Sequence, residues 1–195
     1  CGACIHDAEP RTRRMTLAYL RYLWAQARQS WSKRAKSPHR IPDDALRIIA
    51  RELGTRRARI LCLGARNRRE PDFWRSEGYS EVIAVDLLPS RGVSYGDMHR
   101  LHFPDATFDL IAASHVLEHA FDPGRAIKEI CRVLRPGGML YAAWPTGPSF
   151  VRTDHDRVDH GSASQFRAYV ANFCRAELLW REDAATESKA LLRIR

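Results

Sequence analysis

A glycine and an aspartate are spaced in this chain as in sites that hold a nucleotide. Gly64 follows the apolar run ILCL, and Asp86 stands 22 positions later, at the end of a second apolar run. A glycine at such a turn lets the backbone approach a ligand closely, and an acidic residue about 20 positions further on accepts hydrogen bonds from ribose hydroxyls. The spacing therefore predicts a ribose site at Asp86. The alternative is an aspartate that caps a loop turn.

A pair of histidines is a second candidate for chemistry. The string HVLEH runs from His115 to His119, directly after an apolar run. Histidine titrates near neutral pH, so His115 is a candidate general base that takes a proton from a substrate hydroxyl. Its alternative role is to shape a pocket or to cap a helix. H-x-x-E-H is also a zinc-hydrolase pattern, but no distant third ligand is indicated, and we expect no metal site.

The elements that position these residues alternate along the chain. From residue 59 onward, short apolar runs are separated by helical patterns, which predicts an α/β fold with a parallel sheet covered by helices on both faces. Ligands of such sheets bind at the carboxyl ends of the strands, where Asp86 and His115 stand. We expect strands over 58–63, 81–86, within 93–101, 108–114, 139–144, 175–181 and 188–194, and helices over 70–77, 115–134 and 164–173.

The first 59 residues carry the whole net charge of the chain. They hold 14 Lys and Arg against 5 Asp and Glu, whereas the remaining residues are balanced. We expect a basic helical arm over 1–40 and a second helix over 43–53. The arm is suited to an anionic partner, such as nucleic acid, a phosphorylated substrate or a membrane surface; the alternatives are a solvated helical face and a helix that packs on its own domain. Its apolar stripe, at spacings of three and four, is Leu17, Leu20, Trp24, Ala27 and Trp31.

The cysteines predict a reducing environment. Cys62, Cys131 and Cys174 lie inside apolar segments and are expected to be small buried residues. Cys1 and Cys4 form a C-x-x-C, but no second pair stands at zinc spacing. The odd number and the scatter favour a cytoplasmic location. No apolar run of about 18 residues indicates a transmembrane helix.

The chain from Ile60 to Trp144 resembles the class I S-adenosylmethionine-dependent methyltransferases, and among them the type 11 group. The resemblance rests on LCLG, VIAVDLLP, GDMHRLHFPDATFDLIAASHVLEHAFDP and EICRVLRPGGMLYAAWP, of which the stretch from Gly96 to Gly138 is the most specific. It implies a Rossmann-like sheet of seven mostly parallel strands with an antiparallel last strand. It also implies a methyltransferase domain over 41–195, behind the arm.

The same resemblance implies a site for S-adenosyl-L-methionine. It places the ribose on Asp86 and the adenine near Asp97 and Met98. It also likens Asp159 and His160 to a D-x-x-H segment on the substrate side, which makes His160 a second catalytic candidate; a hydrated, charged loop is the alternative. The cofactor contacts expected in full are Gly64, Ala65, Arg66, Asp86, Leu87, Asp97, Met98 and Ser114.

The first loop departs from the family's pattern. The family carries an acidic residue and then GxGxG, whereas this chain has Cys62 and only the first glycine, with Arg66 and Arg68 at the later glycine places. The guanidinium of Arg66 is suited to pair with the carboxylate of the methionine moiety. Asn67 tolerates a positive φ. We interpret the loop as a variant that still binds the cofactor; the alternative is a loop that has lost it.

These features predict an enzyme that transfers the methyl group of S-adenosylmethionine to an oxygen or nitrogen of a small molecule. SHVLEH stands where amino-methyltransferases carry an NPPY-like segment, which favours oxygen or small-molecule chemistry. Two alternatives remain. One is a catalytically inactive, methyltransferase-like scaffold protein. The other is a nucleic-acid methyltransferase whose basic arm follows phosphates, with strongly salt-dependent binding.

Overall fold

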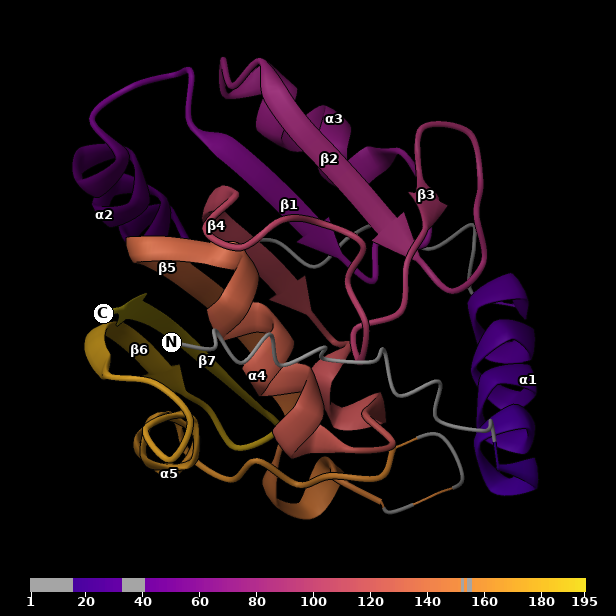
Figure 1. The fold of residues 1–195 in the computed structure, drawn as a ribbon. Coiled ribbons are helices and arrows are strands. Elements are labelled where there is room, and N and C mark those ends of the chain that lie inside the picture. The colour runs from indigo at the N-terminus through magenta and orange to yellow at the C-terminus, as the bar shows by residue number, and fades with distance from the viewer. Residues whose placement is uncertain (1–15, 33–40, 152, 154–155) are drawn as a thin grey trace, which may run out of the picture.

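The computed structural model describes residues 16–32, 41–151, 153 and 156–195, and its centre is a seven-stranded sheet (Figure 1). The strands are β1 (Arg59–Leu63), β2 (Glu81–Asp86), β3 (Ser94–Tyr95), β4 (Phe108–Ser114), β5 (Leu134–Pro145), β6 (Ala176–Asp183) and β7 (Glu187–Ile194). They lie in the order β3-β2-β1-β4-β5-β7-β6. The first five strands pair in parallel, whereas β7 runs antiparallel to both β5 and β6. The predicted Rossmann-like sheet with an antiparallel last strand is confirmed.

The central strands are buried on both faces because their sequences are almost entirely apolar, with Asp109 of β4 as the charged exception among their buried residues. Residues 60–63 of β1 and 108–113 of β4 are all buried. Leu61 is paired with Ile83 of β2 on one side and with Ile111 of β4 on the other. Parallel strands that are covered on both faces show this kind of apolar run. The carboxyl ends of β1, β2 and β4 are therefore held side by side at one edge of the sheet.

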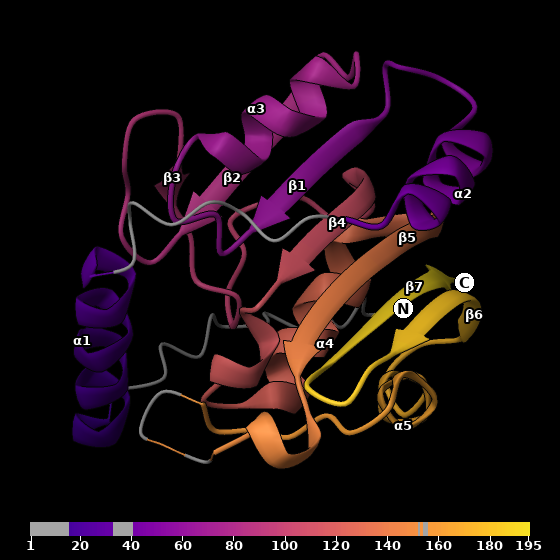
Figure 2. The same cartoon turned by 180° about the vertical axis from the view of Figure 1, so that it is seen from behind.

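Two helices cover each face of the sheet (Figures 1 and 2). They are α2 (Asp43–Leu53), α3 (Arg69–Ser76), α4 (Pro123–Val133) and α5 (Ala163–Val170). α2 and α3 bury Ile49 and Trp74 in the core on one face. α4 and α5 bury Ile130 and Phe166 in the core on the other. The prediction of helices on both faces is confirmed.

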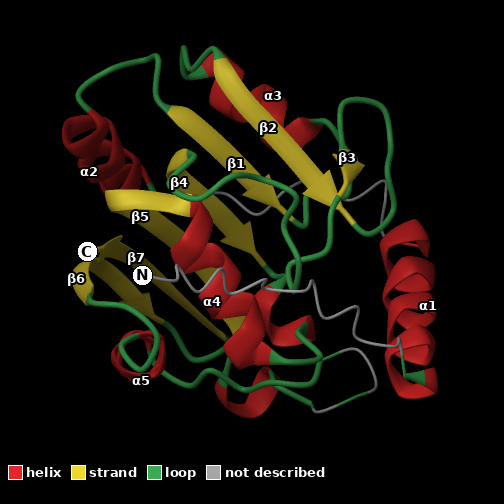
Figure 3. Cartoon of the chain, in the orientation of Figure 1, coloured by secondary structure: helices red, strands yellow, loops and turns green. Residues whose placement is uncertain are grey.

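The N-terminal helix α1 (Leu17–Ser32) lies outside these layers, beside the end of the sheet where β2 finishes (Figure 3). The rings of Tyr19 and Tyr22 pack on Phe121, with centroids 5.3 and 5.4 Å away. The predicted arm is helical over Leu17–Ser32, and residues 1–15 and 33–40 lie outside the described residues. The described part of the arm is thus packed on the domain. The division at residues 40 and 41 stays a prediction.

The stretch 115–134 is mostly helical, as predicted, but no helix begins at His115. A short 3-10 helix, η1 (Leu117–His119), comes first, and α4 begins only at Pro123. His115 has a φ of 51°, which no helix tolerates. The side chain of Asp122 accepts a hydrogen bond from the Arg125 N–H at 3.0 Å. Asp-Pro is thus the true helix start, because the aspartate caps the first turn and the proline fixes φ.

The start of the next strand also differs from the prediction. β5 begins at Leu134 and not at Met139, because Leu134 already pairs with Phe108. The next pair is Leu110 with Met139, so residues 135–138, which lie between the predicted helix and the predicted strand, form an irregularity within the strand. Gly137 has a φ of 84°, which only glycine adopts without strain.

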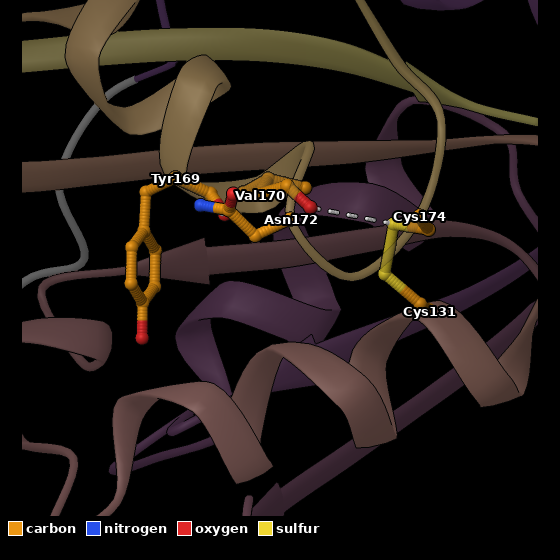
Figure 4. The surroundings of a disulfide bond; sticks show 5 residues. All are labelled: Cys131, Tyr169, Val170, Asn172 and Cys174. Atoms are coloured by element: carbon orange, nitrogen blue, oxygen red, sulfur yellow. Dashed lines mark hydrogen bonds between the residues drawn. A yellow bond between two sulfur atoms is a disulfide. The ribbon is translucent and has the colours of Figure 1, made fainter.

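The prediction of free, buried cysteines holds for one of three. Cys62 is buried and free, but Cys131 of α4 and Cys174 form a disulfide (Figure 4). The two lie 43 positions apart in sequence, with Cα atoms 6.4 Å apart. The apolar neighbours of each cysteine in the sequence do not indicate this disulfide. The two sulfurs meet only because the chain after α5 packs against α4. Because two of the cysteines form a disulfide, the odd number and the scatter of the cysteines no longer support a cytoplasmic location. Cys1 and Cys4 lie outside the described residues.

No helix in the described part of the chain is long and apolar enough to cross a bilayer.

Candidate active site

A pocket opens at the carboxyl ends of β1, β2 and β4, where the sequence predicts the ligand. Seven of the predicted site residues line it: Gly64, Arg66, Asp86, Leu87, Asp97, Met98 and His115. Three others, Ala65, Ser114 and His160, are not among the lining residues. Sequence reasoning missed Tyr22 and Gln26 of α1, which form one wall of the pocket. The one feature of the sequence that could have indicated them is their position on the side of α1 away from the apolar stripe.

Gly64 makes the turn that follows β1, and only glycine fits there. Its φ is 77°, and a Cβ atom at this position would lie 2.4 Å from Cγ2 of Val116. The N–H groups of Gly64 and Ala65 both donate to the carbonyl oxygen of Val85, at 2.8 and 3.1 Å. These bonds turn the chain across the end of β2. Ala65 is 1% exposed and supports the turn from below, which explains why it does not line the pocket.

Asp86 presents a carboxylate at the end of β2 and is 6% exposed. Its Oδ1 accepts a hydrogen bond from the Leu88 N–H at 2.8 Å, and its carbonyl oxygen accepts one from the Gly96 N–H at 2.9 Å. The backbone is therefore fixed on both sides of the side chain. A Cβ atom at Gly96 would lie 2.6 Å from Cβ of Val85, so this wall needs a glycine. A fixed, buried carboxylate beside a glycine-lined cradle suits the hydroxyls of a ribose.

Asp97 lies in a network that ties α1 to the pocket. His99 Nδ1 lies 2.7 Å from Asp97 Oδ1, and the hydroxyl of Tyr19 donates to Asp97 Oδ2. His99 Nε2 accepts from the N–H groups of Phe121 and Asp122 at 3.1 and 3.2 Å, so its proton is on Nδ1 and donates to Asp97. Burial opposes ionisation of Asp97, but these hydrogen bonds outweigh it and hold its pKa below the ordinary value. Asp97 is an anion that already binds α1.

Arg66 and Glu70 place a guanidinium and a buried carboxyl group close to the first loop. The pKa of Glu70 is raised to about 8, mainly by burial; the guanidinium of Arg66 opposes this rise, and the carboxylate of Asp86 adds to it. The carboxyl group of Glu70 in turn adds to the effect of burial in raising the pKa of the Cys62 thiol. Cys62 stands where the resembled family carries an acidic residue. Glu70, on α3, brings a carboxyl group close to that place from a different element, which sequence reasoning missed.

His115 is held between two carboxylates. Its Nε2 lies 2.6 Å from Oε1 of Glu187 on β7, and its Nδ1 lies 3.6 Å from Oε1 of the buried Glu118. Burial lowers the pKa of His115, but the bonds to Glu118 and Glu187 outweigh it and raise the pKa to about 9. The bond from His115 is the main reason that the pKa of Glu187 falls to about 2. At neutral pH the imidazole therefore carries a proton and faces the pocket as a cation.

His160 lies in the core and not at the pocket. Its ring packs on those of Trp144, Phe166 and Tyr169, with centroids 5.9, 5.2 and 6.4 Å away. Burial lowers its pKa, so the imidazole is neutral. Its Nε2 has no hydrogen-bond partner among the described residues. The structure gives His160 a packing position; its predicted catalytic role stays a prediction.

Three side chains near HVLEH have the types of metal ligands. One atom each from Glu118, His119 and Asp156 lie within 4.8 Å of one another. His119 Nδ1 lies 3.0 Å from Asp156 Oδ1, so these two already form an ion pair or hydrogen bond. The direct contact accounts for their proximity, and the group carries no argument for a metal.

Comparison with known proteins agrees with this geometry. Residues 61–142 match the family described as "Methyltransferase domain". A ubiquinone/menaquinone biosynthesis C-methyltransferase UbiE from Laribacter hongkongensis is 36% identical over 75 residues, which cover 35% of this chain and 31% of that protein. A malonyl-[acyl-carrier protein] O-methyltransferase from Pseudescherichia vulneris is 31% identical over 129 residues, or 60% of this chain and 49% of that protein.

A solved structure has the same fold over most of the chain. The 1,6-didemethyltoxoflavin-N1-methyltransferase of Burkholderia thailandensis, with bound S-adenosylhomocysteine, gives a TM-score of 0.64 at 18% identity and covers 90% of this chain and 85% of that one. At this identity the likeness shows the fold alone. This chain spans about a third of the length of the first of these curated relatives and about half of the second. The names of these three proteins refer to carbon, oxygen and nitrogen acceptors, so they leave the acceptor atom open.

Proposed function

Residues 61–142 match the methyltransferase domain family, and from this premise we propose that the protein is an S-adenosylmethionine-dependent methyltransferase acting on a small molecule, with an oxygen or nitrogen as acceptor. The cofactor binds in the pocket at the ends of β1, β2 and β4. The observation that carries the proposal is that Asp86, the glycine cradle and His115 line one pocket. Inactive scaffold proteins do not need a proton-carrying residue at the same pocket as the ribose acceptor.

The residues present fit the cofactor. Gly64 and Gly96 line the pocket with backbone alone, because a Cβ atom at either position would overlap Val116 or Val85, and Asp86 supplies the buried acceptor for ribose hydroxyls. Arg66 lines the pocket at the first loop, where the carboxylate of the methionine moiety would lie. When bound, S-adenosylmethionine supplies an electrophilic methyl group. The protein then has to align the acceptor and receive its proton.

His115 is the group that receives the proton in this proposal. It lies at the end of β4, in the pocket, and its neutral form has a ring nitrogen that accepts a proton. Glu187 holds the ring through Nε2 at 2.6 Å and stabilises the imidazolium that forms. Lys189 lies 3.0 Å from the other oxygen of Glu187 and keeps that carboxylate ionised. Because the pKa of His115 is about 9, the neutral form becomes abundant only in alkaline solution.

Isothermal titration with S-adenosylmethionine and S-adenosylhomocysteine tests the proposal. We expect both ligands to bind, with one site per chain, and to raise the unfolding temperature because they bind only the folded state. The absence of both heat and a thermal shift at millimolar ligand would show that the altered loop no longer holds the cofactor. The inactive scaffold would then be the better description.

The first loop gives a prediction about Arg66. If its guanidinium pairs with the cofactor carboxylate, Arg66→Ala should weaken S-adenosylhomocysteine binding by roughly 5- to 30-fold, as for the loss of a charge-assisted hydrogen bond. Binding of adenosine, which lacks the carboxylate, should change less than about twofold. Titration of both ligands into both proteins measures the difference.

A matched control separates pairing from space. Arg68 is more than half exposed and pairs with Asp72 at 2.7 Å, so Arg68→Ala should leave both affinities unchanged. If Arg66 only occupies a place that a glycine would fill better, Arg66→Gly should bind both ligands as well as or better than the natural protein. That outcome would contradict the pairing.

A further inference from the structure

The two sides of α1 face different surroundings. Tyr19, Tyr22 and Gln26 point to the domain, where Tyr19 binds Asp97 and the other two line the pocket. At 100° per residue these three lie within about 60° of one another on the helix. The apolar side chains on the other side of the helix are exposed: Leu17 to 65%, Leu20 to 43%, Trp24 to 66% and Trp31 to 66%. They also fall within about 60°, nearly opposite the first set.

Basic side chains border this exposed stripe. Arg21 and Arg28 are exposed and lie next to it on the helix, and the guanidinium of Arg28 stands 5.2 Å from the ring centroid of Trp24. The sequence from 11 to 36 holds eight Lys and Arg and no Asp or Glu. Trp24 and Trp31 also border a shallow apolar depression together with Leu88. The outward face of α1 therefore combines aromatic and aliphatic groups with positive charge alone.

We infer that the outward face of α1 docks on an anionic membrane surface. Tryptophan and leucine beside arginine is the combination with which a helix lies in the interface of a bilayer, its apolar face among the acyl chains and its cations at the headgroups. α1 has 16 residues, about 24 Å, and lies along the surface of the domain, so it docks in the plane of the membrane and does not cross it.

Two other occupants fit the face less well. A second copy of the chain, related by a twofold axis, would bring the same arginines of both helices together with no carboxylate on either helix to offset them. A nucleic acid would pair with the arginines, but its phosphates offer nothing to Leu17 and Leu20. The membrane satisfies both the charge and the apolar stripe.

Vesicle binding of the whole chain tests the inference. Flotation with phosphatidylcholine vesicles and with vesicles of equal parts phosphatidylcholine and phosphatidylglycerol should recover the protein only with the anionic lipid, and less at 500 mM than at 50 mM salt. Trp74 and Trp144 are fully buried, so a blue shift of tryptophan fluorescence on binding that persists in Trp180→Phe would report Trp24 and Trp31.

Variants locate the contact. Trp24→Ala and Arg28→Glu should each lower the partition coefficient at least about fivefold. Arg167→Glu makes the same charge change at an exposed position on α5 and should lower it less than about twofold. Thermal unfolding of each variant confirms that it is folded.

The inference would be overturned by no binding to anionic vesicles, by equal loss in Arg28→Glu and Arg167→Glu, or by a dimer in solution that Trp24→Ala converts to a monomer. A fluorescence shift with a DNA duplex but not with vesicles would assign the face to nucleic acid and overturn it as well. None of these results depends on cofactor binding, so the test stands apart from the proposed methyltransferase activity.

Discussion

Asp86→Ala should weaken the binding of S-adenosylhomocysteine by about 10- to 150-fold, which corresponds to the roughly 1.5–3 kcal/mol of a hydrogen bond to a charged group. The reason is that the buried carboxylate at the end of β2 is the acceptor proposed for the ribose hydroxyls. Adenosine should lose affinity by a similar factor, because it carries the same ribose. This distinguishes Asp86 from Arg66, which should discriminate between the two ligands. Titration calorimetry measures both constants.

Asp86→Asn serves as the control for the loop. Asp86 also accepts the Leu88 N–H at 2.8 Å, so alanine removes a hydrogen bond of the loop as well as a ligand contact. Asparagine keeps one acceptor oxygen for Leu88 and should unfold at the same temperature as the natural protein. Its affinity for the ligand should lie between that of the natural protein and that of the alanine variant. Unchanged affinity in Asp86→Ala would show that the ribose lies elsewhere.

His115 should remain protonated up to a pH of about 9 in the free protein, and Glu187→Gln should lower that pKa by at least about one unit. The substitution removes the carboxylate 2.6 Å from Nε2, while burial, which favours the neutral ring, remains. Nitrogen-detected NMR titration of the imidazole follows the change, with His115→Gln identifying the signal. A His115 that titrates at 6.5 or below in the natural protein would contradict the geometry.

A second carboxylate provides the control. Glu177→Gln removes the same charge from β6, where Glu177 pairs with Arg195 at 2.6 Å, and should leave the titration of His115 unchanged.

The rate of methyl transfer should depend on pH through the fraction of His115 that is neutral. If the neutral ring receives the substrate proton, the rate constant should rise about tenfold per pH unit between pH 7 and the pKa.

The same pair makes folding stability depend on pH. The pKa of His115 rises from 6.5 to about 9 on folding, so its contribution is complete below 6.5 and is lost as the pH rises through about 9. The pKa of Glu187 falls from 4.5 to about 2, so its contribution is complete above 4.5 and is lost as the pH falls through about 2. The pair therefore stabilises the fold most between pH 4.5 and 6.5.

The strands could be predicted because their signal is local. β1 and β4 are buried on both faces, so the apolar runs that mark them in the sequence have a direct cause in the sheet. The position of Asp86 at the edge of the sheet follows from the same pattern and is confirmed. The prediction of a helix from His115 failed because the positive φ of this residue excludes a helix, and no pattern in the sequence indicates that angle.

The contacts that complete the site could not be predicted because they join distant segments. Tyr19 binds Asp97 across 78 positions, and His115 binds Glu187 across 72. The apolar stripe is the clearest pattern of α1 in the sequence, but the pocket is lined by the opposite side of the helix. Its polar and aromatic side, with Tyr19, Tyr22 and Gln26, is the side that packs on the domain.

β6 reaches the sheet only through β7, which lies between it and β5. The two strands are joined by three residues, 184–186, so they close on each other at little entropic cost and join the sheet as a hairpin. Cys174 stands two positions before β6, and its bond to Cys131 ties this hairpin to α4, which runs directly into β5. The bond acts as a short tether that raises the effective concentration of the hairpin beside its partner strand. Chains that have formed it therefore search a smaller volume to complete the sheet than chains whose two thiols are still reduced.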